Sequence, residues 1–381
     1  MQKNDLFFGL LVFLLLALCI YLLSCNFRGK RIGYIPVETK LNRSDSVALF
    51  RFEKDGKFRG MHIHSDKNLT TADLLPLVRN NVEWIVHTPF LVQENARSTE
   101  IEVYDYRDIK GVDRTNYEKD LLKSTNACNI KCVVKPLVWL KNPAAGEWRG
   151  ALRFKKNSEW ESWSEQYRAI ILKQAEVCEE MKVEAFCIGT ELTSIVQRHP
   201  DFLEQLAKDI RQIYSGKLLY AANWDQEFEQ VPFWAELDYI GISAYFPLSK
   251  RPFPEVRHIK RGWKKHLSKI EKISRQFNKQ VVFTEVGYRS TSLAADRPWE
   301  WAKDSHQLGE RPSPTTQANC YKALFESCWE KDWFAGVLLW DWKIGETLAE
   351  DRIEINFNPK EKPAEAVFAR WFGSEGDGSG K

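Results

Sequence analysis

The amino-acid sequence predicts a protein of the α/β class whose main domain is a closed (β/α)8 barrel, a TIM barrel. Eight short runs of apolar and β-branched residues, typical of strands buried on both faces, alternate with segments of helical periodicity. Polar and aromatic residues gather directly after these runs, where the rim of a parallel barrel lies. The 381 residues, 44% of them hydrophobic, suffice for one barrel of ~250 residues with additions.

The barrel is expected to span residues 57–373. The eight predicted strands cover 57–64, 82–87, 131–138, 184–189, 217–222, 238–244, 280–284 and 336–339. Helices are predicted over 70–80, 117–128, 159–181, 202–214, 256–277, 315–330 and 364–372. An open doubly wound sheet is the alternative. It needs a glycine-rich phosphate loop after its first strand, and Gly60-Met61-His62 does not resemble one.

The first 25 residues are interpreted as a targeting segment outside the fold. Leu6 to Leu23 is an uninterrupted run of 18 apolar or small residues, just long enough to cross a bilayer. The run ends in Leu-Leu-Ser-Cys, which resembles the processing box of bacterial lipoproteins and makes Cys25 the candidate lipidation site. An uncleaved membrane anchor is the alternative. The basic residues that follow the run favour cleavage under the positive-inside tendency.

Both interpretations predict an exported protein that its N-terminus holds at a membrane, in the periplasm or at the cell surface. Residues 26–56 are expected to form a tether and lead-in to the barrel, and residues 374–381 a disordered tail. Six cysteines lie beyond the targeting segment, and the sequence selects no disulfide pair among them. Cys178 and Cys187 are expected to be small apolar residues buried in a helix and a strand.

Composition and motifs exclude several classes of function. The formal net charge of +3, with 28% charged residues, gives no reason to expect nucleic acid or another polyanion as a partner. The sequence has no Cys/His cluster with zinc spacing, Walker loop or Gly-x-Ser-x-Gly elbow, so we expect neither a metal nor a cofactor. The chain has 15 Trp, and those predicted in loops, such as Trp299, suggest flat apolar faces that stack on sugar rings.

Two of the buried runs end in a single glutamate, Glu191 after the fourth predicted strand and Glu285 after the seventh. Each glutamate alone is equally well explained as the start of the next helix, where a carboxylate stabilises the N-terminal dipole. Active sites of these barrels, however, are built at the carboxyl ends of the strands. The fourth and seventh strands lie across the barrel mouth from each other. A pair of carboxyl groups that meets there is equipped to hydrolyse a glycosidic bond.

Hydrolysis with retention requires two carboxyl groups ~5–5.5 Å apart, one proton donor and one nucleophile. We expect Glu191 to be the acid, with its pKa raised by partial burial and by the charge of its partner. Glu285 is expected to be the nucleophile. Tyr245, after the sixth strand, is the natural hydrogen-bond donor to it, with rim packing as the alternative. Trp340 or Trp342 on the eighth strand could form the floor of a sugar-binding subsite, with core packing an equal alternative.

Several stretches resemble glycoside hydrolase family 113 of clan A, whose characterised members are retaining endo-β-1,4-mannanases. The resemblance runs from about Gly60 to Trp342, nearly the whole barrel. Its more specific parts are Ile-Gly-Thr-Glu-Leu and Ala-Ala-Asn-Trp-Asp. The matching stretches are 88–90, 135–136, 159–167, 187–192, 220–225, 238–247 and 284–288.

Carried over by position, the resemblance implies that Glu191 is the acid/base and Glu285 the nucleophile. It also implies that Tyr245 is the partner of the nucleophile and that Asn223 and Trp224 lie at the rim near the substrate. The other residues expected to contact substrate are Thr190, Lys135, Trp299, Trp340 and Trp342.

Two positions depart from the pattern of these enzymes. Most clan A enzymes have Asn before the acid/base, where it holds the sugar 2-hydroxyl, and Thr190 stands there in this chain. We therefore expect sugar identity to be read at Thr190. Leu137 follows Lys135-Pro136 at a position where the mannanase pattern suggests a polar residue or His.

The sequence therefore predicts a retaining glycoside hydrolase of the endo-β-1,4-mannanase type, which cleaves β-linked polysaccharide or oligosaccharide by double displacement. A membrane-tethered carbohydrate-binding protein on an inactive barrel is the alternative, since the fold alone does not exclude it. The matched pair of glutamates favours the hydrolase, because a binding protein has no need of both.

Overall fold

The computed structural model of the chain describes residues 51–65, 67–103, 117–301, 309–345 and 354–374. The predicted targeting segment, the tether up to residue 50 and the tail from residue 375 lie outside the described residues. Within the described ranges, no helix combines the length and the hydropathy that crossing a membrane requires.

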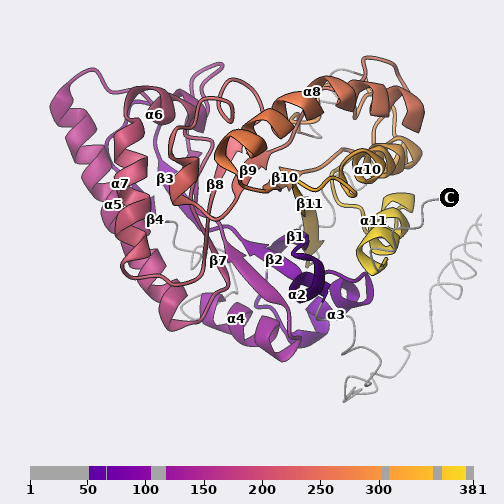
Figure 1. Cartoon of the computed structure of the whole chain (residues 1–381), viewed down its shortest axis with the longest axis horizontal. Helices are drawn as coiled ribbons and strands as arrows, with labels where there is room; N and C mark the ends of the chain where they lie inside the picture. The colour runs from indigo at the N-terminus through magenta and orange to yellow at the C-terminus, as the bar shows by residue number, and fades with distance from the viewer. Residues whose placement is uncertain (1–50, 66, 104–116, 302–308, 346–353, 375–381) are drawn as a thin grey trace, which may run out of the picture. The chain divides into compact units, whose positions relative to one another are not determined.

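Eight parallel strands close into a barrel with helices around it, as the sequence predicts (Figure 1). The strand order around the barrel is β1-β11-β10-β9-β8-β7-β5-β2. The strands are β1 (Phe58–Ser65), β2 (Trp84–His87), β5 (Lys131–Val134), β7 (Ala185–Thr190), β8 (Lys217–Asn223), β9 (Ile240–Ser243), β10 (Val281–Val286) and β11 (Phe334–Ile344). Each predicted strand overlaps one of these, so the repeated apolar runs were sufficient to indicate the fold class.

Helices cover the outside of the strands (Figure 1). Those described are α2 (Arg51–Asp55), α3 (Thr71–Arg79), α4 (Tyr117–Ala127), α5 (Asn157–Glu180), α6 (Thr193–Arg198), α7 (Pro200–Arg211), α8 (Val256–Phe277), α10 (Pro314–Cys328) and α11 (Pro363–Gly373), with 3₁₀ turns η3 (Arg149–Ala151) and η4 (Phe233–Glu236). Helix α8 has the predicted bounds because its apolar periodicity is long and regular. Helix α6 was not predicted, since six residues are too few for a periodic pattern to show.

Side chains alternate along the barrel strands between the barrel interior and the layer of helices. On β7, Ala185 and Cys187 belong to the interior cluster, whereas Phe186 and Ile188 pack in the layer beneath the helices. All six cysteines in the described ranges are buried and none of them is in a disulfide, and Cys178 and Cys187 lie in α5 and β7 as expected.

The first described helix, α2, closes the amino end of the barrel. Its Phe52 is 7% exposed and packs edge-on against Phe58 of β1 and Trp84 of β2, with ring centroids 5.1 and 4.8 Å away. Residues 51–55, which fall within the predicted lead-in, therefore pack against the amino end of the barrel through Phe52.

The predicted third strand, 131–138, is two strands in the structure. Strand β5 ends at Val134, and β6 (Leu137–Leu140) leaves the barrel to pair with β3 (Phe90–Gln93), which also pairs with the short β4 (Glu102–Val103). Pro136 stands at the break, where its missing N–H cannot continue the ladder. This small second sheet forms one wall of the opening at the carboxyl end of the barrel.

Candidate active site

Glu191 and Glu285 lie at the carboxyl end of the barrel and line one cleft of about 870 Å³. Glu191 directly follows β7, and Glu285 lies near the end of β10, with β8 and β9 between these two strands. The two residues are 5% and 6% exposed. Each carboxyl group therefore opens on the cleft but is largely shielded from bulk water.

Glu285 is held between two hydrogen-bond donors. The buried ammonium of Lys135, on the segment between β5 and β6, donates to its Oε1 and forms an ion pair with it. The hydroxyl of Tyr245, just after β9, donates to its Oε2 at 3.1 Å. The imidazole of His62 on β1 lies on the same side of the barrel, where its Nε2 hydrogen-bonds the carbonyl of Thr284 at 2.9 Å.

Glu191 has a different set of partners. Asn223 Nδ2, at the end of β8, donates to its Oε1 at 2.8 Å. The guanidinium of Arg149, in η3, forms an ion pair with its Oε2 at 2.5 Å. Arg149 also donates from Nε to the carbonyl of Val138 at 3.2 Å, so the guanidinium is fixed at its base to β6.

The surroundings move the pKa values of the two carboxyl groups in opposite directions. Burial raises the pKa of Glu191, and the charge of Glu285 raises it further, although the Arg149 guanidinium opposes both effects. Burial alone would raise the pKa of Glu285, but the Lys135 ammonium outweighs it and holds the pKa of Glu285 well below its usual range. One glutamate is thereby kept ionised while the other is pushed toward its protonated form.

Two neighbours of Glu285 keep fixed protonation states near neutral pH. Burial, followed by the charge of Lys135, lowers the pKa of His62 to about 3, so its imidazole is neutral. Burial and the charge of Glu285 raise the pKa of Tyr245, so its hydroxyl keeps the proton that it donates to Glu285. The positive charge that neutralises Glu285 therefore comes from Lys135.

Most residues that the sequence singled out do line the cleft with the two glutamates. They are Asn223, Trp224, Tyr245, Trp299 and Trp340. Asn223, Trp224 and Tyr245 end or directly follow barrel strands at the carboxyl rim, so their positions could be inferred from strand ends, whereas Trp340 lies within β11 and Trp299 in the long connection after β10.

Lys135 and Thr190, which the sequence also singled out, are not among the residues that line the cleft. The Lys135 side chain is completely buried beneath Glu285. The Thr190 hydroxyl donates to the carbonyl of Pro136 at 2.9 Å and lies 3.4 Å from Lys135 Nζ. Thr190 thus helps to hold the segment that carries Lys135. We expect the sugar hydroxyls to be bound by side chains that line the cleft.

The side chain of Trp342 lies in the hydrophobic core and does not line the cleft, in line with the core-packing alternative. A strand period of two places Trp340 and Trp342 on the same face. A β-bulge intervenes: Met61 and Ile63 of β1 face Leu339 and Trp342 of β11, so three steps on one strand match two on the other. Trp340 therefore faces the cleft while Trp342 faces the core.

Several residues that line the cleft were not predicted as site residues. Arg149 and the exposed Trp148 come from the loop after β6, and the exposed Trp139 lies on β6 itself. The segment carried one usable signal, because two tryptophans and an arginine stand close together in a predicted loop. Nothing in their spacing indicated that the loop folds back over Glu191.

Exposed tryptophans reach the cleft from opposite sides of the barrel. Trp139 and Trp148 belong to the connection between β5 and β7, and Trp299 and Trp301 belong to the connection between β10 and β11, half a turn away in the strand order. Trp299 stacks on Trp224 with centroids 5.2 Å apart. Flat aromatic faces are therefore available on both sides of the carboxyl pair.

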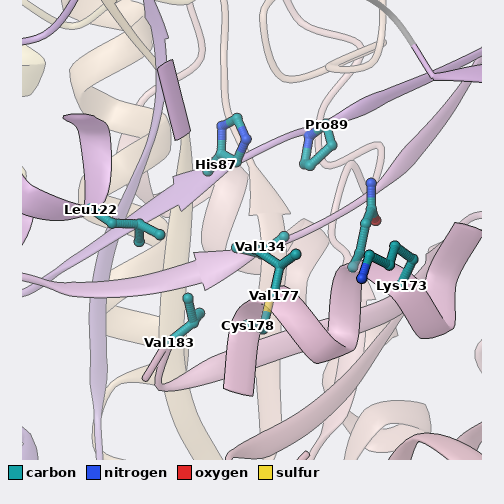
Figure 2. Close-up of a pocket in the computed structure, with 9 residues that line it drawn as sticks. His87, Pro89, Leu122, Val134, Lys173, Val177, Cys178 and Val183 are labelled. Carbon is teal, nitrogen blue, oxygen red and sulfur yellow. The ribbon is translucent and has the colours of Figure 1, made fainter. Parts of the chain in front are cut away.

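A second cavity of about 80 Å³ shares no lining residue with the cleft. Figure 2 shows His87 and Val134 from the strands and Val177 and Cys178 from α5 around it. Its lining is mainly apolar and it holds no pair of carboxyl groups, so it is a packing gap between the strands and α5. In the described part of the chain, no three His, Cys, Asp or Glu side chains are grouped to hold a metal ion.

A closed (β/α)8 barrel with two buried glutamates at the ends of its fourth and seventh strands, in one cleft rich in tryptophan, defines the protein as a glycoside hydrolase. The model of Glycoside Hydrolase Family 113 matches residues 57–352. The chain belongs to glycoside hydrolase family 113.

Solved structures support the same assignment. A GH113 β-1,4-mannanase in a complex structure superposes with a TM-score of 0.69 at 24% identity, covering 84% of this chain and 100% of that one. GH113 β-mannanase AaManA from Alicyclobacillus acidocaldarius, in complex with ManMIm, gives 0.68 at 25% identity, covering 83% and 97%. A β-glucuronidase from Ruminococcus gnavus shares the fold at TM-score 0.56 and 12% identity, covering 83% and 50%. No curated protein sequence matches the chain.

Proposed function

We propose that the protein is a retaining endo-β-1,4-mannanase with Glu285 as nucleophile and Glu191 as acid/base. The observation that carries the proposal is the opposite electrostatic setting of two glutamates in one cleft, one beside Lys135 and the other with its pKa raised. Membership of family 113 and the likeness to GH113 β-mannanases over nearly their whole length support mannan as the substrate.

The chemistry follows a double displacement. In the first step the ionised carboxylate of Glu285 attacks the anomeric carbon, while protonated Glu191 gives its proton to the departing glycosidic oxygen. The result is a covalent glycosyl ester on Glu285 and an ionised Glu191. In the second step Glu191 takes a proton from water, the hydroxide attacks the same carbon, and Glu285 leaves as a carboxylate.

Endo action is supported by the tryptophans on both sides of the carboxyl pair. Stacking faces on opposite sides let a sugar chain continue past the bond that is cleaved, whereas an exo-acting site needs a wall on one side. Leu137 lines the cleft as an apolar residue, so the contacts of that wall with sugar are apolar as well.

The proposal is tested by a reducing-sugar assay of the purified protein on β-mannan, glucomannan, cellulose and xylan. We expect soluble fragments of mixed length from mannan and glucomannan, and the β-anomer as the first product by NMR. Release of monosaccharide only would contradict endo action, and binding without turnover would indicate the carbohydrate-binding alternative.

Removing the guanidinium of Arg149 is expected to move the basic limb of kcat/KM to higher pH. The positive charge of Arg149 lowers the pKa of Glu191, so Arg149→Met raises it further and keeps the acid protonated at higher pH. The measurement is the pH profile of kcat/KM on manno-oligosaccharide. Arg153→Met is the matched control, because Arg153 pairs with Glu147 and does not line the cleft. A basic limb that stays in place would show that another group sets it.

We also propose that residues 1–25 export the enzyme and anchor it to a membrane through Cys25. The support is the apolar run that ends in Leu-Leu-Ser-Cys. Cys25→Ser is expected to abolish labelling of the protein by radioactive palmitate in a bacterial host, with Cys19→Ser as the control that keeps the label. A labelled band that persists in Cys25→Ser would overturn lipidation at this residue.

A further inference from the structure

Glu227 is a buried carboxyl group behind the cleft that no step of the chemistry uses. It lies in the loop after β8, its residue is 0% exposed, and it does not line the cleft. We propose that Glu227 is a positioning residue for Glu191, which it holds in place through Asn223 and Tyr220. The proposal rests on the proposed role of Glu191 as the acid/base.

Glu227 accepts hydrogen bonds from three donors on two different elements. The hydroxyl of Tyr220 on β8 donates to its Oε1. The hydroxyl of Thr193, the first residue of α6, and the backbone N–H of Asn223 both donate to its Oε2 at 2.8 Å. Because every one of these partners is a donor, the network fits the ionised carboxylate.

One arm of the network reaches the carboxyl group of Glu191. Glu227 holds the backbone N–H of Asn223, and the Asn223 amide donates from Nδ2 to Glu191 Oε1 at 2.8 Å. The rotamers that are open to an Asn side chain depend on its backbone conformation. The bond from Glu227 therefore helps to determine where the amide of Asn223 meets Glu191.

The other arm reaches the backbone that follows Glu191. The hydroxyl of Tyr220 accepts the N–H of Leu192 at 2.9 Å while it donates to Glu227. Glu191 itself has a φ of 52°, a left-handed conformation that residues other than glycine rarely adopt. Such a conformation persists only where the surroundings impose it, and the N–H groups on both sides of this residue are held, since Glu191 N donates to the carbonyl of Ala221 at 2.7 Å.

The charges around Glu227 are consistent with this role. The pKa of Glu227 is raised to about 7: burial is the main cause and the charge of Glu191 adds to it, while the hydrogen bonds from the three donors oppose the rise. Burial and the charge of Glu227 raise the pKa of Tyr220, so the tyrosine remains the donor. The hydrogen bonds from Tyr220 and from the Asn223 N–H therefore favour the ionised form of Glu227 against the effect of burial.

The test compares two substrates that differ in their need for an acid. Mannohexaose has a poor leaving group and requires proton donation, whereas 2,4-dinitrophenyl β-mannobioside does not. We expect Glu227→Gln and Tyr220→Phe each to lower kcat/KM on mannohexaose roughly 10- to 100-fold, and on the aryl substrate by less than about threefold. The double variant is expected to lose little more than the more severe single variant, because both belong to one network.

Glu83→Gln is the matched control. Glu83 is also a buried glutamate whose pKa burial raises to about 7, but it lies just before β2 at the amino end of the barrel, where it accepts the N–H of Phe52 at 3.1 Å. We expect it to lower Tm and leave the ratio of the two kcat/KM values unchanged.

Equal losses on both substrates in Glu227→Gln and Tyr220→Phe, or losses that add in the double variant, would overturn the positioning role. If Glu227→Gln does not fold, Tyr220→Phe alone decides between the two outcomes. The variant Glu191→Ala tests the proposed function separately. If Glu191 is not the acid/base, this variant loses the same factor of kcat/KM on mannohexaose and on the aryl substrate.

Discussion

Glu285→Ala is expected to lower kcat/KM on manno-oligosaccharides by roughly 10⁵-fold, the scale seen when a covalent nucleophile is removed. The loss is large because no other described carboxylate stands between a buried ammonium and a tyrosine hydroxyl in this cleft. The measurement uses enough protein to quantify residual turnover. Glu229→Gln, an exposed glutamate paired with Lys269 outside the cleft, is the control for an altered surface charge.

Azide provides the second readout for Glu285→Ala. The small anion fits the space that the side chain leaves and attacks an activated aryl β-mannoside from the face that Glu285 occupied. The expected product is the α-mannosyl azide, which NMR distinguishes from the β-anomer. A folded variant with more than about a hundredth of the original rate, or a β-azide product, would contradict the role of Glu285 as nucleophile.

Glu191→Ala is expected to lower kcat/KM on manno-oligosaccharides by roughly 10²- to 10⁴-fold, the usual contribution of general acid catalysis. On 2,4-dinitrophenyl β-mannobioside the same variant is expected to keep most of its kcat/KM, because that leaving group departs without a proton. Its kcat on the aryl substrate should nevertheless fall, since Glu191 also activates the water in the second step.

Azide separates this variant from the first. In Glu191→Ala the anion replaces water in the second step, so the product is the β-mannosyl azide and kcat on the aryl substrate recovers. Equal losses of kcat/KM on both substrates would argue against Glu191 as the acid. An α-mannosyl azide from Glu191→Ala would indicate that Glu191 is the nucleophile and Glu285 the acid/base.

The barrel could be predicted because its signals are local. Buried parallel strands are short apolar runs, and helices such as α8 carry a long amphipathic repeat. The structure differs from the prediction where the pairing of strands that are distant in sequence determines where a strand ends or which way a side chain faces. Pro136 divides the expected third strand, and the bulge between β1 and β11 turns Trp342 into the core. Pro136 is a local signal for the break but not for the new partner of β6, and the bulge has no signature in a single strand.

The cleft was predicted in part for the same reason. Residues that end barrel strands, such as Asn223 and Tyr245, inherit their position from the strand. Arg149 comes from a loop, and its contact with Glu191 depends on how the β3–β6 wall places that loop. Glu227 lies in the loop after β8, and its hydrogen-bond donors come from β8 and α6. These partners become apparent only in the folded structure, where the three segments meet.

The sequence by itself determined the eight-stranded barrel and the two strand ends that carry Glu191 and Glu285, because strand order and the carboxyl rim follow from local patterns. Only the tertiary structure revealed the groups that keep Glu285 ionised and raise the pKa of Glu191. A pKa depends on charges within a few ångströms and on burial, and the ammonium of Lys135 and the guanidinium of Arg149 reach the two carboxyl groups from distant parts of the chain.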